Sequence, residues 1–303
     1  MEYITLNNGI KMPQVGLGTF LIPQDKLSET IAKAYELGYR SFDTAWRYHN
    51  ESIIADALKG HGIKREEVFL TTKVNADALF FDRYHGGALR FLNIPIRSVR
   101  KAVEMSFENL KTDYVDLFLV HTPWPMYPKM YEVLTELYHQ GRIRAIGISS
   151  FLPPMIDSLQ DVSDVVPAVN QFEISPLNTQ KQLIKYCQGK HIAVEAMSVF
   201  SHFRSNEPRT EIIKNPTIMP IAEKYGKTIP QVILRWLTQQ NIIVIPKTWD
   251  YEHLKENIDI FDFELSPEEM LVIDSLDRGA FLNYNPYGLM GSVPKKYRGW
   301  KGF

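Results

Sequence analysis

The chain lacks the features that mark secreted, membrane-spanning and disulfide-stabilised proteins. Among its 303 residues there is one cysteine, Cys187, which excludes an intramolecular disulfide and a cysteine-based zinc cluster and fits a reducing compartment. The longest apolar runs, such as residues 242–245, are far shorter than the ~20 residues needed to span a bilayer. The opening sequence MEYITLNNGIKMP has neither the basic nor the apolar segment of a signal peptide.

Charge of one sign is also lacking. The 34 Lys and Arg balance 35 Asp and Glu, which leaves a formal net charge of −1. A nucleic-acid partner needs a basic surplus, and a solvating tail needs an acidic one. We therefore expect a soluble cytoplasmic protein without a nucleic-acid or membrane partner. No Gly/Ser-rich linker or low-complexity tract divides the chain, so residues 1–303 are expected to form a single domain.

Short apolar runs recur along the chain, mostly at spacings that suit one loop–helix–loop unit. They predict eight strands, at residues 15–18, 41–45, 69–74, 116–121, 145–149, 168–173, 192–197 and 242–247. Several are nearly continuous apolar runs, as in parallel strands covered on both faces. Helical periodicity lies between them, for example at residues 27–37 and 99–110. This alternation predicts an α/β protein with a (β/α)8 TIM barrel.

The main alternative is an open doubly wound sheet, which usually carries GxGxxG after its first strand. Here residues 16–20 read Gly-Leu-Gly-Thr-Phe and lack the third glycine. Asn8-Gly9 predicts an N-terminal β-hairpin over residues 3–14, expected to plug one end of the barrel.

Extra chain is expected in three places. The long gaps after the third and seventh strands put the loops 75–95 and 199–215 at the face where barrel active sites form. The first is expected to shape substrate choice. The tail 279–303 is rich in Gly, Pro and aromatic residues, and packing is its favoured role.

Six predicted strands end in polar side chains. They are Asp43, Lys73, His121, Ser149, Gln171 and Lys247. One buried polar strand end can be a satisfied core hydrogen bond. Six on one rim favour a functional site, because the active sites of such barrels lie at the carboxyl ends of the strands.

Three of these residues, together with Tyr48, suggest proton donation to an oxygen. A tyrosine with a pKa near 10 is a poor acid unless a nearby ammonium such as Lys73 stabilises its phenolate. Asp43 could hold that ammonium, and His121 could orient a carbonyl. Each also has a plainer interpretation: Tyr48 as a surface aromatic, Lys73 as a structural partner of Asp43, and His121 as a core histidine.

Other chemistries fit less well. A single strand-end histidine and a lysine do not make a metal site, so no metal is expected. No serine lies in a GxSxG elbow, which disfavours acyl transfer. A lyase that uses Lys73 as a Schiff base remains an alternative.

The sequence resembles the aldo-keto reductase family over about residues 5–278. The resemblance depends most on residues 38–51, GYRSFDTAWRYHNE, which look like the family's long signature. Similar stretches follow in family order at residues 71–74, 116–121, 141–149, 169–171 and 245–248.

The resemblance implies NAD(P)H-dependent reduction of an aldehyde or ketone to an alcohol, with NADPH as cofactor and NADH as a second candidate. Tyr48 would be the proton donor, Lys73 and Asp43 would tune it, and His121 would orient the carbonyl. The implied cofactor-binding residues are Gly18, Thr19, Phe20, Asp43, Ser149, Ser150, Gln171, Met197, Ser198, Val199, Phe200, Lys247, Thr248, His253, Glu256 and Asn257. The implied substrate-binding residues are His121, Trp124 and Phe20.

Four positions differ from the family's usual residues. Ser150 replaces an asparagine, Met197 replaces a tyrosine that stacks on the nicotinamide, and Thr122 replaces an aromatic residue of the substrate pocket. His253 replaces an arginine that often contacts the 2′-phosphate. The alternative function on the same barrel is a nucleotide-binding regulatory or structural protein with little turnover. The expected partner is a small carbonyl substrate, and the expected assembly is a monomer or weak homodimer.

Overall fold

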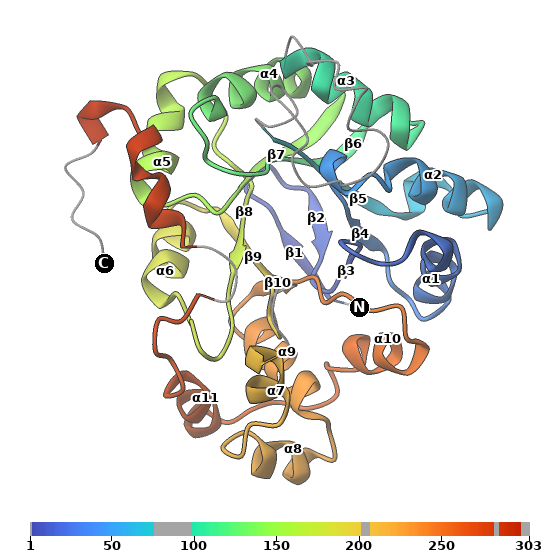
Figure 1. The fold of residues 1–303 in the computed structure, drawn as a ribbon, viewed down its shortest axis with the longest axis vertical. Helices are drawn as coiled ribbons and strands as arrows, with labels where there is room; N and C mark the ends of the chain where they lie inside the picture. The colour runs from blue at the N-terminus through green and yellow to red at the C-terminus, as the bar shows by residue number, and fades with distance from the viewer. Residues whose placement is uncertain (1, 76–98, 201–206, 282–284, 298–303) are drawn as a thin grey trace.

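Eight parallel strands form one sheet that is surrounded by helices (Figure 1). The structure is a computed structural model that describes residues 2–75, 99–200, 207–281 and 285–297. The strands of this sheet are β3 (Leu17–Gly18), β4 (Ser41–Asp43), β5 (Phe69–Val74), β6 (Val115–Val120), β7 (Ile143–Ser149), β8 (Val169–Glu173), β9 (Ala193–Met197) and β10 (Ile242–Val244). Every residue of β5 and β6 is buried, as expected for strands covered on both faces.

The sheet closes on itself. The strands pair in the order β10-β9-β8-β7-β6-β5-β4-β3. A parallel bridge between Val15 and Val244 then joins the two edges, where the Gly16 amide donates to the Val244 carbonyl at 2.9 Å. The predicted (β/α)8 barrel is therefore confirmed, and the doubly wound alternative is wrong.

Helices cover the outside of the barrel (Figure 1). They are α1 (Gln24–Glu36), α2 (Glu51–Gly60), α3 (Val99–Leu110), α4 (Tyr127–His139), α5 (Pro153–Ser158), α6 (Lys181–Gly189), α7 (Glu207–Ile213), α8 (Met219–Tyr225), α9 (Ile229–Thr238), α10 (Tyr251–Ile258) and α11 (Pro267–Asp274). In α1, Leu27, Ile31 and Ala34 are fully buried at helical spacing. Gly38 then takes a φ of 102°, a left-handed conformation in which glycine ends a helix without strain.

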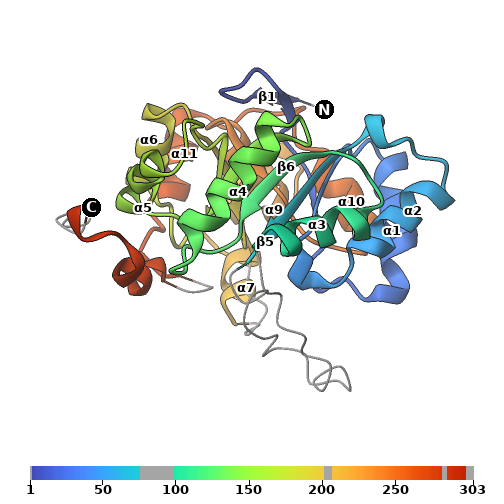
Figure 2. The same cartoon turned by 90° about the horizontal axis from the view of Figure 1, so that it is seen from above.

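The N-terminal hairpin lies at the opposite end of the barrel from α7 (Figure 2). Its strands β1 (Tyr3–Thr5) and β2 (Lys11–Pro13) pair antiparallel, and Gly9 has the positive φ that the turn needs. Leu6 and Met12 pack in one apolar cluster with barrel residues such as Leu117 and Ile243. The predicted plug is confirmed.

Two predicted strands extend too far at their carboxyl ends: the interval 41–45 contains β4 only over Ser41–Asp43, and the last strand is shorter as well. The interval 242–247 was expected to be a strand ending at Lys247, but β10 covers only Ile242–Val244. Pro246 has no amide hydrogen, so it cannot continue the ladder as a donor. Its carbonyl accepts instead from the Gly18 amide at 3.3 Å, and Lys247 lies in the following loop.

The described part of the tail packs against the barrel, as predicted. Val293 is fully buried, and Lys296 forms an ion pair with Asp161 at 2.7 Å. Tyr297 accepts a hydrogen bond from the Gln160 amide at 2.9 Å. Within the described ranges, no helix is both long and apolar enough to cross a membrane.

A buried carboxylate stabilises the sheet at the start of β6. Asp116 is 1% exposed and accepts hydrogen bonds from Arg65 and Arg144, each at 2.6 Å, and from the Leu70 amide at 3.0 Å. Asp116→Ala is expected to lower the free energy of unfolding by about 3 kcal/mol or more, because it leaves these donors without their partner. Denaturant unfolding measures the change.

The matched control is Asp56→Ala. Asp56 pairs with Lys111, but both side chains are more than half exposed. An exposed pair contributes roughly 0–1 kcal/mol, so this variant is expected to unfold almost as the wild type does. If both variants lost the same free energy of unfolding, burial would not make the contacts of Asp116 more stabilising than those of an exposed pair.

Candidate active site

A short turn carries Tyr48 to the rim of the barrel. After β4, residues Trp46–Tyr48 form a single 3-10 turn, and His49 ends it with a left-handed φ of 52°. Asn50 holds the turn in place, because its side chain accepts from Thr44 at 2.5 Å and donates to Thr19 at 3.1 Å. Tyr48 as a whole is partly buried.

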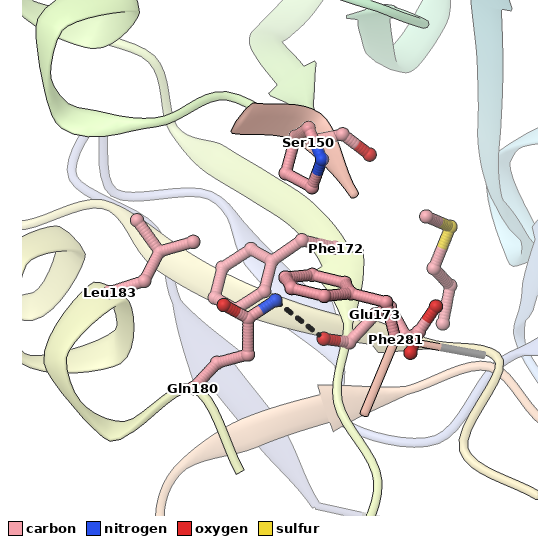
Figure 3. A pocket seen from close by; sticks show the side chains of 8 residues that line it. Ser150, Phe172, Glu173, Gln180, Leu183 and Phe281 are labelled. Atoms are coloured by element: carbon pink, nitrogen blue, oxygen red, sulfur yellow. Dashed lines mark hydrogen bonds between the residues drawn. The ribbon is translucent and has the colours of Figure 1, made fainter. Parts of the chain in front are cut away.

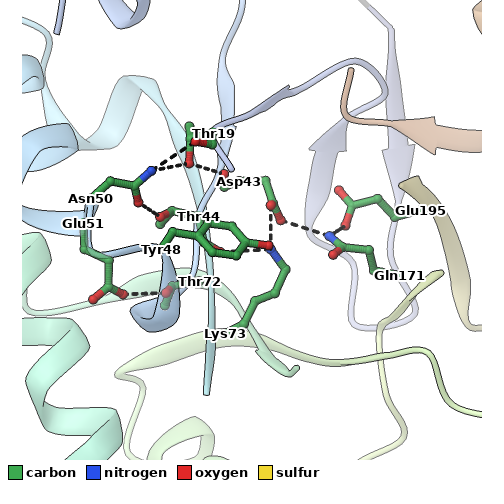
Figure 4. Close-up of polar contacts among 10 residues, drawn as sticks. All are labelled: Thr19, Asp43, Thr44, Tyr48, Asn50, Glu51, Thr72, Lys73, Gln171 and Glu195. Atoms are coloured by element: carbon green, nitrogen blue, oxygen red, sulfur yellow. Dashed lines mark hydrogen bonds and ion pairs between the residues drawn. The ribbon is translucent and has the colours of Figure 1, made fainter. Parts of the chain in front are cut away.

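Lys73 and Asp43 form a buried ion pair beside the Tyr48 hydroxyl (Figure 4). The Lys73 ammonium is fully buried and donates to Asp43 Oδ1 at 2.5 Å and to the Thr44 carbonyl at 2.9 Å. It also lies 3.5 Å from the Tyr48 hydroxyl. Burial is the largest single effect and lowers the pKa of Lys73, but Asp43, Tyr48 and Glu195 together raise it by more, so that pKa lies above its ordinary value. Lys73 therefore stays charged at neutral pH.

Two opposing effects act on the pKa of the Tyr48 hydroxyl. Burial raises the pKa of Tyr48, and the Lys73 ammonium lowers it; burial is the larger, so the net shift is upward. The phenol is consequently protonated at neutral pH, with a cation beside it to stabilise the phenolate once the proton leaves.

His121 lies next to Tyr48. It follows β6 directly, and its amide continues the ladder by donating to the Val74 carbonyl at 2.8 Å. The two rings meet edge-on, with 5.7 Å between their centroids. Burial, and then the charges of Lys73 and Arg47, hold the pKa of His121 well below 6.5. The imidazole is therefore neutral, and among the described residues its Nδ1 has no hydrogen-bond partner.

The network continues across the barrel to a residue that the sequence analysis missed. Gln171 donates through Nε2 to Asp43 at 2.9 Å and to Glu195 at 2.6 Å (Figure 4). Glu195 is fully buried, and burial together with Asp43 raises its pKa to about 8. One signal was available: Glu195 is a single charged residue in the middle of an otherwise apolar predicted strand.

The residues that follow the first strand lie beside Tyr48. The Phe20 ring is 4.6 Å from the Tyr48 ring, and Thr19 donates to the Asp43 carbonyl at 2.8 Å. A Cβ at Gly18 would lie 2.8 Å from the Ile245 carbonyl, so close backbone approach requires glycine there. Thr19 and Phe20 thus lie at the predicted site. The glycine at position 18 is explained by close backbone packing against Ile245.

Two serines leave their strands in a left-handed conformation. Ser150 after β7 has a φ of 62°, and Ser198 after β9 has a φ of 56°. Such backbone is uncommon outside glycine and clusters at functional sites. Ser149, which is buried, pairs in register with Gln171. Ser150 donates through its amide to the Gln171 carbonyl at 2.8 Å.

A pocket opens beside these residues (Figure 3). Ser150 and Met197 line it together with Phe172 and the tail residues Phe281 and Pro286. Two predicted cofactor residues thus share a cavity with the tail. Val199, next along the chain, is buried in the core, and Phe200 packs against the same cluster.

The remaining predicted cofactor residues lie on the loop after β10 and on α10. Thr248 accepts from the Asp250 amide at 3.1 Å, and Asp250 caps α10 by accepting from the His253 amide at 3.0 Å. The His253 side chain is 56% exposed, so it can turn toward a ligand. Glu256 is partly buried, and Asn257 is buried.

Lys247 lies near a second cation. Lys247 is exposed as a whole residue, but part of its side chain is buried. This partial burial, and then the positive charge of Arg209 on α7, lower the pKa of Lys247. Two cations that repel each other across a surface favour an anionic ligand between them.

Trp124, one of the predicted substrate-binding residues, lies at the protein surface. Trp124 is 39% exposed, and its amide donates to the Thr122 carbonyl at 2.9 Å. Thr122 donates through its hydroxyl to Asn75 at 2.8 Å. Most of the predicted substrate loop 75–95, and His202 and Arg204 of the second loop, lie outside the described residues.

Comparison with known proteins identifies the family. The sequence model described as the aldo/keto reductase family matches residues 14–278. The chain belongs to this family. It is 37% identical over 294 residues to the glyoxal reductase of Bacillus subtilis (strain 168), covering 95% of this chain and 98% of that protein. Over 286 residues it is 37% identical to the methylglyoxal reductase DkgA of Yersinia pestis, covering 93% and 95% of the two chains.

Solved structures agree. An aspartate-to-alanine mutant of Gox0644 in complex with NADPH superposes with a TM-score of 0.81 at 32% identity, covering 94% of this chain and 97% of that one. The predicted family, fold and reaction class are confirmed: the aldo/keto reductase described here is an oxidoreductase that reduces aldehydes or ketones to alcohols.

Proposed function

We propose that this aldo/keto reductase reduces small aldehydes such as 2-oxoaldehydes, with NADPH as hydride donor and Tyr48 as proton donor. One observation carries the assignment of the donor: the Tyr48 hydroxyl lies 3.5 Å from the Lys73 ammonium, beside an imidazole that is neutral at neutral pH and so has no acidic second proton to give. The substrate class is supported by the glyoxal and methylglyoxal reductases among the relatives.

Each group then has one task. Tyr48 holds the proton at its hydroxyl and gives it to the substrate oxygen as negative charge develops there. Lys73 stabilises the phenolate that remains, and Asp43 fixes the position of Lys73. His121, which is neutral, donates a hydrogen bond that orients the carbonyl. When bound, the nicotinamide supplies the hydride.

The residues present fit a phosphorylated dinucleotide. The mutual repulsion of Lys247 and Arg209 would be relieved by a phosphate between them. Ser149, Ser150 and Gln171 offer hydroxyl and amide groups near Tyr48 for the carboxamide, and Met197 can pack on the nicotinamide ring. Gly18, Thr19 and Phe20 would line the cleft, Ser198, Val199 and Phe200 would lie along the pyrophosphate, and Thr248, His253, Glu256 and Asn257 would meet the adenosine end.

The lyase alternative is disfavoured by the state of Lys73. A Schiff base forms from a neutral amine, whereas the pKa of Lys73 lies above its ordinary value because of Asp43. Its ammonium is already engaged by three oxygens.

The reaction is tested by mixing the purified protein with NADPH and methylglyoxal and following the absorbance of the reduced nicotinamide. Loss of absorbance that depends on both protein and aldehyde supports the proposal. Absence of turnover across a panel of aldehydes, with NADPH still bound, would favour the regulatory or structural alternative. The same proposal includes a single barrel domain over residues 1–303, a cytoplasmic location suited to a buried free cysteine, and a monomer or weak homodimer.

His253→Arg is expected to increase the preference for NADPH over NADH by about ten- to a hundredfold, because a charge-assisted hydrogen bond contributes roughly 1.5–3 kcal/mol. Histidine is shorter than arginine and lacks the planar fork of donors with which a guanidinium binds phosphate. The wild type should therefore use both cofactors, with a modest NADPH preference. Titration of both reduced cofactors against the wild type and the variant measures this.

Lys255→Arg is the matched control, because Lys255 is an exposed cation on the same helix. It should leave the cofactor preference as it is. A wild-type preference for NADPH above about a thousandfold would contradict the role of His253.

A further inference from the structure

A line of hydrogen bonds runs through the barrel interior from Tyr48 to Glu195. Lys73 connects the Tyr48 hydroxyl to Asp43 Oδ1, and Gln171 connects Asp43 Oδ2 to Glu195 Oε2 (Figure 4). Glu195, Gln171, Asp43 and Lys73 are all at most 3% exposed. Because water is largely excluded from these groups, a change of charge at one end is weakly screened at the other.

Glu195 is poorly solvated as an anion. Its Oε2 has one donor, Gln171, and its Oε1 has no partner in the part of the chain that the structure describes. The same Gln171 nitrogen also serves Asp43, which brings a second carboxylate close by. A carboxylate with so few donors in a buried site favours its neutral form. In keeping with this, burial and Asp43 raise the pKa of Glu195 to about 8.

We propose that Glu195 is a positioning residue for proton transfer: acting through Gln171 and Asp43, its charge state sets how well Lys73 stabilises the Tyr48 phenolate. The inference rests on the proposed role of Tyr48 as proton donor. With Glu195 protonated, the charges of Asp43 and Lys73 cancel. With Glu195 ionised, the cluster carries a net negative charge, which opposes formation of a further anion at Tyr48.

The charged groups that face Glu195 come from two other strands. Asp43 of β4 disfavours its ionisation, and Lys73 of β5 favours it. On the neighbouring strands, β8 contributes the neutral amide of Gln171, and Ile243 of β10 is its apolar register partner. Glu173, the acidic residue of β8, lines the pocket of Figure 3. Burial is the largest effect on the pKa of Glu195, and Lys73 does not cancel Asp43, because Asp43 has the larger effect of the two.

The expected signature is a partial fall in the rate of reduction. As pH rises through about 8, where Glu195 ionises, kcat for aldehyde reduction should decrease to a lower plateau and not to zero. The fall should be up to about tenfold, the effect expected for two unit charges roughly 10 Å apart at an effective dielectric constant of about 20. A second fall, at higher pH, follows when Tyr48 itself loses its proton.

The variant that tests this is Glu195→Gln, which imitates the protonated side chain at every pH. Its kcat profile should lack the first fall, so the ratio of kcat at pH 7 to kcat at pH 9 should approach one. Glu51→Gln is the matched control. Glu51 is equally buried and burial raises its pKa too, but its carboxylate accepts from Thr72 and Asn109 and is not bonded to Asp43. The control should keep the first fall.

Infrared spectroscopy provides a readout without catalysis. A protonated buried carboxyl group has a carbonyl stretch above the amide I band, and this band should disappear with a midpoint near pH 8 in the wild type and be missing in Glu195→Gln. A wild-type kcat profile without the first fall would overturn the inference, with no variant needed. A fall that persists in Glu195→Gln would do the same. Neither result contradicts Tyr48 as the proton donor, which the Tyr48→Phe variant tests separately.

Discussion

Tyr48→Phe is expected to abolish aldehyde reduction while leaving NADPH binding nearly unchanged. Phenylalanine keeps the ring, and with it the contacts to Phe20 and His121, but removes the hydroxyl that lies 3.5 Å from Lys73. General acid catalysis typically contributes about 10²–10⁴-fold, so kcat should fall by at least that factor. His121 cannot substitute as acid, because its pKa is held well below 6.5.

The measurement is kcat for methylglyoxal reduction together with the Kd for NADPH. Tyr138→Phe is the matched control, since Tyr138 lies on α4 and its ring contacts His139. It should behave as the wild type does. Residual activity of Tyr48→Phe within roughly threefold of wild type would remove Tyr48 from the mechanism.

The rim of the barrel could be predicted from the sequence because strand adjacency follows from chain order. Asp43, Lys73 and His121 end consecutive strands, and consecutive strands of a β/α barrel are neighbours. Polar side chains at three neighbouring carboxyl ends must therefore lie close together. The hairpin was equally readable, because Asn8-Gly9 specifies its turn locally.

Two features could not be read in this way. The distance from Tyr48 to Lys73 depends on the turn that ends at His49 with a left-handed φ and on the hydrogen bonds of Asn50 with Thr44 and Thr19. Lys247 was expected at a strand end, but the strand stops before Pro246. In the first case tertiary hydrogen bonding decides the local backbone, and sequence periodicity carries no record of it. In the second case the missing amide hydrogen of Pro246 opposes a longer strand, a signal that the apolar run 242–245 masks.

Glu195 was missed for a different reason. A strand assignment tells which side chains alternate, but not which residues an inward side chain meets across a closed barrel. The link from Glu195 to Asp43 passes through Gln171 of β8, the strand that pairs with β9, so it emerges only when three strands are placed together. The sequence held the unusual residue, and the structure supplies its partners.

Lys73→Met is expected to lower the rate of reduction by at least about 10²-fold, because the phenolate then forms without a cation beside it in a site of low polarity. The pH dependence should move as well. Lys73 lowers the pKa of Tyr48 against the larger effect of burial, so without Lys73 that pKa rises further. The phenol then stays protonated to higher pH, and the alkaline fall in the residual rate should move to higher pH. If Lys73 only stabilised the fold, Lys73→Met would leave the pH of this alkaline fall unchanged.

Stability must be separated from chemistry, because Lys73→Met leaves the Asp43 carboxylate buried without its ion-pair partner. Removing one partner of a buried pair costs about 3–5 kcal/mol in unfolding free energy. The double variant Lys73→Met with Asp43→Asn removes both charges and should recover most of that loss, while reduction stays slow. Recovery of the rate together with stability would show that Lys73 acts only by compensating Asp43. A slow but stable double variant, with its alkaline limb displaced upward, assigns Lys73 to the proton transfer itself.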